Sequence, residues 1–121
     1  HAIRICKNLL EEGCYLSIYD PKVDKKQIDK DLNELINTDS KLPEIKKRWR
    51  VYSSSLEAAE GSDAIVLITE WDEFFNLELN KIYKVMRTPC WIFDTRNIIN
   101  VENAKKIGFN IWKLGDGNIY F

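Results

Sequence analysis

Three segments of the chain pass from apolar to polar residues in a similar way. Residues 64–72 read Ala-Ile-Val-Leu-Ile-Thr-Glu-Trp-Asp, and residues 16–22 and 91–97 each run from apolar residues into an acid and then a base. An apolar run without alternation is typical of a parallel strand that is covered on both faces. We therefore predict strands whose polar carboxyl ends meet at one edge, with residues 64–69 in the centre. Ligands of open α/β sheets bind outside that edge.

Helical spacing of apolar residues separates these strands. It predicts a helix over residues 2–12, one after Asp24, a short one after Ser54 with Leu56 and Ala59 inward, one from residue 79 and one after Asn100. Residues 49–52 and 110–114 are predicted as further strands, and residues 37–48 as a surface loop. Helices that alternate with strands over short loops indicate an α/β fold with a mostly parallel sheet.

The amino end of the chain is unusual for such a fold. A doubly wound domain starts with a strand, whereas residues 2–12 have the pattern of a helix. We expect residues 1–121 to form a single domain from which the first strand is missing, and therefore to be a fragment of a longer protein. A chain of 121 residues suffices for one domain with its own core.

Composition removes several classes of function. The chain has 45% apolar and 31% charged residues and a net charge of −1, which argues against a nucleic-acid partner. The basic residues 46–48 are interpreted as a solvated loop. No apolar run is long enough to cross a membrane. Three cysteines without metal-type spacing indicate reduced, buried thiols of a cytoplasmic protein, and one histidine argues against a catalytic triad or a histidine metal site.

Asp20 is the first candidate site residue. It ends a strand that follows a helix, where a dinucleotide-binding unit places the acid that binds ribose hydroxyls. The glycine-rich phosphate turn that should precede that helix is absent from the chain. The structural alternative is that Asp20 starts an Asp-Pro turn with Pro21.

Glu70 and Asp72 follow the central predicted strand, and the two carboxylates suit acid–base work or recognition of hydroxyl groups. Asp72 alternatively caps the turn that follows. Trp71 lies between them and offers a flat face for a base or a sugar, although a single tryptophan beside an apolar strand more often serves packing.

Arg96 lies two residues beyond the strand that ends at Asp94. A guanidinium group at such an edge can bind a phosphate or diphosphate with two parallel hydrogen bonds, which a lysine cannot reproduce. The alternative role is an internal salt bridge to Asp94 or Glu70. Spacing alone leaves both roles open.

Three segments taken together resemble one family. Residues 18–23 (Ile-Tyr-Asp-Pro-Lys-Val), 69–74 (Thr-Glu-Trp-Asp-Glu-Phe) and 92–97 (Ile-Phe-Asp-Thr-Arg-Asn) resemble, in order and spacing, the carboxyl-terminal UDP-sugar-binding domain of the UDP-glucose 6-dehydrogenase family. Residues 107–109 fit as well, so the resemblance covers nearly the whole chain. The Thr-Glu-Trp-x-x-Phe segment looks more like the UDP-glucose branch than the mannose-type branches. The family has Gly where this chain has Thr95.

The resemblance implies a Rossmann-like domain with helices on both faces of its sheet. It also implies an NAD-dependent oxidation of UDP-glucose to UDP-glucuronate, with an amino-terminal NAD-binding domain and a nucleophilic cysteine upstream of this chain. Arg96 would then contact the nucleotide sugar, with Glu70 and Asp20 as further candidates. We expect no metal, a homo-oligomeric complete enzyme, and no activity from these residues alone. The alternative is a non-catalytic flavodoxin-like signalling or scaffold domain with a strand-end acid as its phosphoacceptor.

Overall fold

The computed structural model describes residues 2–36, 42–45, 48–114 and 119–120. The chain forms two compact units, His1–Ala58 and Ala59–Phe121, and each has a sheet of its own. The α/β class and the mostly parallel strands that the sequence predicts are confirmed. A single domain over residues 1–121, a missing first strand and helices on both faces of one sheet stay predictions.

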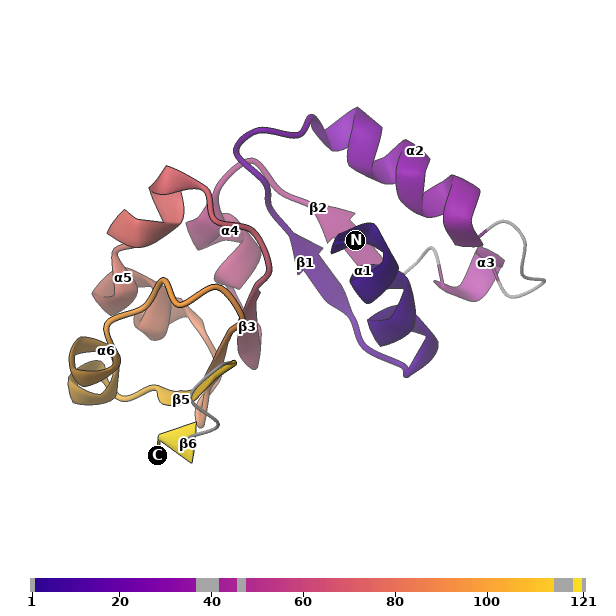
Figure 1. The fold of residues 1–121 in the computed structure, drawn as a ribbon. Helices are drawn as coiled ribbons and strands as arrows, with labels where there is room; N and C mark the ends of the chain where they lie inside the picture. Colours follow the sequence, from indigo (N-terminus) through magenta and orange to yellow (C-terminus); the bar gives the residue numbers. More distant parts are fainter. Residues whose placement is uncertain (1, 37–41, 46–47, 115–118, 121) are drawn as a thin grey trace. The chain divides into compact units, whose positions relative to one another are not determined.

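The first unit packs helices against a pair of short parallel strands (Figure 1). Its elements are α1 (Ala2–Glu11), β1 (Leu16–Ile18), α2 (Lys25–Ile36), α3 (Leu42–Ile45) and β2 (Trp49–Val51), followed by α4 (Ser55–Ala59) at the boundary. The apolar stripes predicted for α1 and α2 form part of its core, and α3 and β2 supply the rest. That core comprises Leu10, Ile28, Leu32, Ile36, Ile45, Trp49 and Val51.

Two sequence predictions in this unit are wrong. Residues 42–45 of the predicted loop form α3, because Ile45 is buried in the core. Arg48 of the basic run is half-buried rather than fully solvated: its Nη1 donates hydrogen bonds to the carbonyl oxygens of Leu10 and Cys14, at 2.7 and 3.2 Å. These carbonyls stand at the end of α1, where helices leave acceptors unpaired. Lys46 and Lys47 lie outside the described residues.

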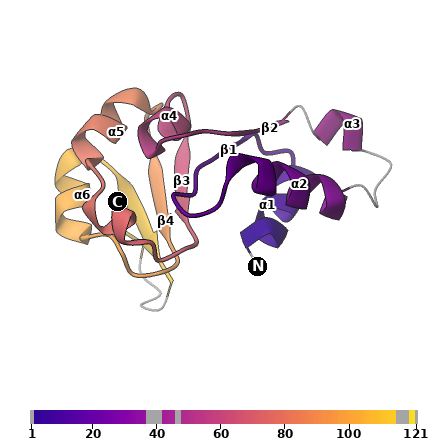
Figure 2. The ribbon, with the colours of Figure 1, turned by 90° about the horizontal axis from the view of Figure 1, so that it is seen from above.

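The second unit contains a four-stranded sheet of order β3-β4-β5-β6. The first three strands, β3 (Ala64–Leu67), β4 (Trp91–Asp94) and β5 (Asn110–Lys113), are parallel, and β6 (Ile119–Tyr120) is antiparallel. The 3₁₀ helix η2 (Asp72–Asn76) and the helix α5 (Leu79–Val85) connect β3 to β4, and α6 (Val101–Ile107) connects β4 to β5. Figures 1 and 2 show α5 and α6 on the same side of this sheet.

The strand at residues 64–67 is not central. Among the strands that the structure describes, β3 lies at the edge of its sheet and pairs only with β4, so the prediction of a central strand is wrong. The prediction of a strand covered on both faces is also wrong. Ala64 and Val66 point to an exposed face, and Val66 is 42% exposed, whereas Leu67 is buried. Leu56, which we expected to point inward from α4, is also exposed, while Ala59 of the same helix is buried.

Both ends of α6 follow from the sequence. The side chain of Asn100 accepts a hydrogen bond from the backbone N–H of Asn103 at 3.0 Å, which caps the first turn. Gly108 ends the helix with φ of 130°, a conformation that side chains disfavour. The ring of Tyr83 from α5 packs edge-on against Phe109 with a centroid distance of 5.2 Å. These contacts fix α5 and α6 relative to β5.

Candidate functional site at the ends of β3 and β4

The carboxyl ends of β3 and β4 lie side by side in the second unit, with Leu67 in register with Asp94. Thr95 joins them beyond the last paired residues, since both its backbone N–H and its hydroxyl donate to the carbonyl oxygen of Leu67. The two segments that follow, residues 68–72 and 95–99, therefore start from a common point. Sequence spacing predicted this meeting of polar strand ends.

Asp94 organises the loop that follows β4. Its carboxylate is fully buried and accepts backbone hydrogen bonds from Arg96 at 3.1 Å and from Ile98 and Ile99 at 2.8 Å each. A buried charge is tolerated only where such donors compensate it. The loop therefore wraps around the carboxylate and presents the side chain of Arg96 outward from a fixed backbone.

The structure brings Arg96 and Glu70 together. Nε of Arg96 donates to the carbonyl oxygen of Ile68 at 3.2 Å, and its Nη1 lies 3.8 Å from Oε1 of Glu70. The two side chains are 41% and 60% exposed. The salt bridge to Glu70 that the sequence allowed is thus present, while Asp94 interacts with the backbone N–H of Arg96.

Lys113 is the residue of this site that sequence reasoning missed. It stands opposite Asp94 in the register of β5, and it is one of the few buried charged residues among those described. Its Nζ donates to Oδ1 of Asn97 at 2.9 Å and lies 3.7 Å from Oδ2 of Asp94. The signal was present in the sequence, because in the predicted strand 110–114 Lys113 falls on the same face as the apolar Ile111.

Asp20 belongs to the first unit. Its Oδ1 accepts hydrogen bonds from the backbone N–H groups of Lys22 at 2.7 Å and Val23 at 3.0 Å. This is the Asp-Pro turn that the sequence offered as the structural alternative. A ligand role for Asp20 is not tested by this arrangement and stays a prediction.

The remaining strand-end candidates differ in exposure. Trp71 is half-buried and precedes η2 as its N-cap without a side-chain cap bond, and Asp72 is already the first residue of that helix. The prediction that Asp72 caps the turn is therefore wrong. Glu70 is the exposed carboxylate that pairs with Arg96.

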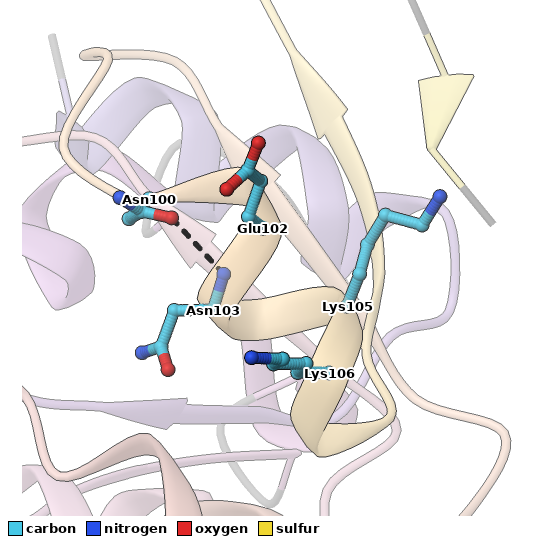
Figure 3. Close-up of a pocket in the computed structure, with 5 residues that line it drawn as sticks. All are labelled: Asn100, Glu102, Asn103, Lys105 and Lys106. Carbon is cyan, nitrogen blue, oxygen red and sulfur yellow. Dashed lines mark hydrogen bonds between the residues drawn. The ribbon is translucent and has the colours of Figure 1, made fainter.

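A hollow in the surface lies along α6 and shares no lining residue with these contacts. Figure 3 shows its lining, which consists of Asn100, Glu102, Asn103, Lys105 and Lys106. All five come from α6 and its cap, and none of them is buried. The side chain of Asn100 is already used to cap the helix. The hollow thus has no buried polar group to hold a ligand.

The cysteines and acids of the described ranges suggest no further reactive centre. Cys6, Cys14 and Cys90 are free thiols, and burial raises the pKa of Cys6 and Cys90. No group of three potential metal ligands occurs within residues 2–36, 42–45, 48–114 and 119–120. Over the same stretches, no helix is long and apolar enough to cross a membrane.

Comparison with known proteins yields a family and named relatives. Residues 1–101 match the family model described as "UDP-glucose/GDP-mannose dehydrogenase family, UDP binding domain". The chain is 44% identical over 115 residues to UDP-glucose 6-dehydrogenase of Drosophila melanogaster, and 38% identical over 121 residues to UDP-glucose 6-dehydrogenase 2 of Arabidopsis thaliana. Each match covers 94% of this chain, and 24% and 25% of those proteins. The chain thus spans about a quarter of the curated relatives that it matches.

Proposed function

The chain belongs to the UDP-glucose/GDP-mannose dehydrogenase family, and we propose that it forms the UDP-binding part of an NAD-dependent UDP-glucose 6-dehydrogenase. The reaction would oxidise UDP-glucose to UDP-glucuronate. The observation that carries this proposal is the match of residues 1–101 to the UDP-binding domain of that family. The catalytic cysteine and the NAD-binding domain are assigned to polypeptide outside these residues, so this chain alone should be inactive.

Arg96 is proposed as the residue that binds the anionic part of the nucleotide sugar. Its Nε is already bonded to the carbonyl oxygen of Ile68, which leaves the terminal nitrogens to face a ligand. The planar guanidinium group suits a pair of phosphate oxygens, once its terminal nitrogens turn from Glu70 to the ligand. The backbone on which it stands is held by the buried carboxylate of Asp94.

The present partner of Arg96 is easily exchanged. Glu70 and Arg96 are both substantially exposed and their nearest charged atoms are 3.8 Å apart. Such surface pairs contribute only about 0–1 kcal/mol. A charge-assisted pair of hydrogen bonds to a diphosphate is stronger. The diphosphate can therefore replace Glu70 as the partner of Arg96. Glu70 then becomes available to accept a hydrogen bond from a hydroxyl group of the ligand.

NAD is proposed to bind mainly outside this chain. A dinucleotide phosphate turn places glycines between a strand and the helix that follows it. The described glycines Gly13, Gly61 and Gly108 instead follow the helices α1, α4 and α6. These residues do not fit a phosphate turn, and we assign no step of the hydride transfer to them.

The remaining properties of the complete enzyme are proposals of the same kind. We propose a cytoplasmic homo-oligomer that binds UDP-glucose and UDP-glucuronate through this domain and works with an NAD-binding domain of the same polypeptide. Neither nucleic acid nor a membrane is proposed as a partner, and no metal is required. The near-neutral balance of 18 basic and 19 acidic residues supports the exclusion of nucleic acid.

The test is the oxidation of UDP-glucose by the complete enzyme, followed as NADH formation. Arg96→Ala should raise KM or lower kcat by more than about twofold, because a lost charged hydrogen bond costs about 1.5 to 3 kcal/mol. Arg87→Ala is the matched control. Arg87 belongs to the same unit and is likewise exposed. It pairs with Asp63, and these two residues precede β3 and β4 in the chain, so they lie at the opposite ends of these strands from Arg96. Equal kinetics of both variants would refute the role of Arg96.

A further inference from the structure

The loop that carries Arg96 is fixed on both sides of the arginine. On one side, Thr95 donates twice to Leu67, and on the other Asn97 accepts from Lys113. Asn97 has φ of 58°, in the left-handed region, which asparagine tolerates better than most residues. The side chain of Asn97 is held by the hydrogen bond that it accepts from Lys113.

Lys113 connects the side chain of Asn97 to the carboxylate of Asp94, around which the loop turns. Its ammonium group lies 2.9 Å from Asn97 Oδ1 and 3.7 Å from the carboxylate oxygen of Asp94 that also accepts from Ile98 and Ile99. One cation therefore contacts both the carboxylate around which the loop turns and the residue directly after Arg96. Since β5 pairs with β4, the ammonium is carried by a neighbouring strand rather than by the loop itself.

Burial makes this arrangement costly. The side chains of Lys113 and Asp94 are 11% and 0% exposed, and the removal of both charges from water requires compensation. A well-packed apolar residue often stabilises such a position at least as well as an ion pair. A buried lysine with a loop asparagine as its hydrogen-bond acceptor is therefore better suited to fixing one loop geometry than to stability alone.

We propose that Lys113 is a positioning residue for Arg96, acting through Asp94 and Asn97. This inference rests on the proposed function, in which Arg96 binds the diphosphate of the nucleotide sugar. Lys113 does not contact the ligand in this account. It holds the backbone of residues 95–99 so that the guanidinium group is already oriented when the ligand arrives, which lowers the ordering cost of binding.

The test is a double-mutant cycle in the complete enzyme, with kcat and KM for UDP-glucose measured for Lys113→Met, Arg96→Ala and the double variant. Lys113→Met should raise KM at least fivefold and change kcat less than twofold. If Lys113 acts through Arg96, its effect must disappear in the Arg96→Ala background, so the double variant should match Arg96→Ala within twofold.

Two results overturn this inference on its own. If Lys113→Met raises KM by the same factor with and without Arg96, Lys113 acts independently of the arginine. If Lys113→Met leaves KM within twofold of the parent value, Lys113 does not position Arg96. Both results leave the proposed function intact. If Arg96→Ala itself leaves KM and kcat unchanged, the proposed role of Arg96 fails, and the positioning role fails with it.

A second pair of variants covers the case in which Lys113→Met does not fold. Asn97→Gly keeps a residue that accepts the positive φ but removes the acceptor for Lys113, and it should raise KM. Asn97→Asp retains an acceptor oxygen and should restore KM to within twofold of the parent. Equal KM values for the two Asn97 variants would overturn the inference.

Discussion

The hydroxyl group of Thr95 donates a hydrogen bond of 2.6 Å to the carbonyl oxygen of Leu67, beyond the last paired residues of β3 and β4. The backbone N–H of Thr95 donates to the same oxygen at 3.2 Å. The hydroxyl bond is an interaction that a residue without a side-chain donor could not make at this position. It ties the residue before Arg96 to the segment that carries Glu70.

We expect Thr95→Val to separate the hydroxyl bond from the shape of the side chain. The variant loses one part-buried hydrogen bond, which corresponds to about 1 kcal/mol of unfolding free energy. Urea denaturation measures this loss. Thr95→Ser keeps the hydroxyl group and should retain more of the stability. A Thr95→Val protein as stable as the parent would show that the hydroxyl bond contributes nothing.

Glu70→Gln tests whether the carboxylate serves the ligand or only the arginine. The pair with Arg96 is exposed and its loss should change stability by less than about 1 kcal/mol. If Glu70 accepts from a hydroxyl group of the nucleotide sugar, KM for UDP-glucose should rise about threefold to tenfold, because a charged acceptor is replaced by a neutral one. A lower KM would instead identify Glu70 as a competitor for Arg96.

Gly108 permits a close approach between the end of α6 and α5. An added Cβ would lie 2.6 Å from the hydroxyl oxygen of Tyr83, at a residue with φ of 130°. Gly108→Ala should therefore lower the free energy of unfolding by about 2 to 4 kcal/mol, from backbone strain and from displacement of the Tyr83 ring.

The control for this variant is Gly61→Ala, also a glycine with positive φ. There an added Cβ would meet no atom within 4 Å, so backbone strain alone should lower stability by about 1 kcal/mol. Urea unfolding of both variants compares the two effects. Equal losses would mean that the ring of Tyr83 yields to the new methyl group at no cost.

Cys90 should be protected from alkylation in the folded protein. Its side chain is fully buried, and burial raises the pKa of the thiol, so less of the reactive thiolate is present at a given pH. Iodoacetamide at pH 8 should modify the half-buried Cys14 well before Cys90, and unfolding should equalise them. Peptide mass spectrometry measures both rates. Fast labelling of Cys90 in the native protein would contradict its burial.

Much of the fold could be predicted from local pattern. The helices α1, α2, α5 and α6 have apolar residues at helical spacing, and capping residues such as Asn100 mark where they begin. The error at β3 has a physical cause, since an apolar run shows that a strand suits burial but not which neighbours cover it. Val66 has an apolar side chain and is nevertheless 42% exposed.

The site was predicted only in part because its contacts depend on strand register. Spacing placed Arg96 and Glu70 at strand ends, and the structure joins them. Lys113 could be connected to Asn97 only once β4 and β5 were in register. A phosphoacceptor must be accessible, which the fully buried Asp94 is not, whereas Glu70 and Asp72 are exposed. The local sequence does not show which residues face each other across strands or which acids are buried.

Calorimetric titration of the complete enzyme with UDP tests most directly whether Arg96 holds the diphosphate of the ligand. Arg96→Ala should weaken UDP binding about 10- to 150-fold, the equivalent of about 1.5 to 3 kcal/mol for a charged hydrogen bond. Arg87→Ala, which removes an exposed arginine of the same unit, should leave Kd within twofold. An unchanged Kd for Arg96→Ala would contradict the account.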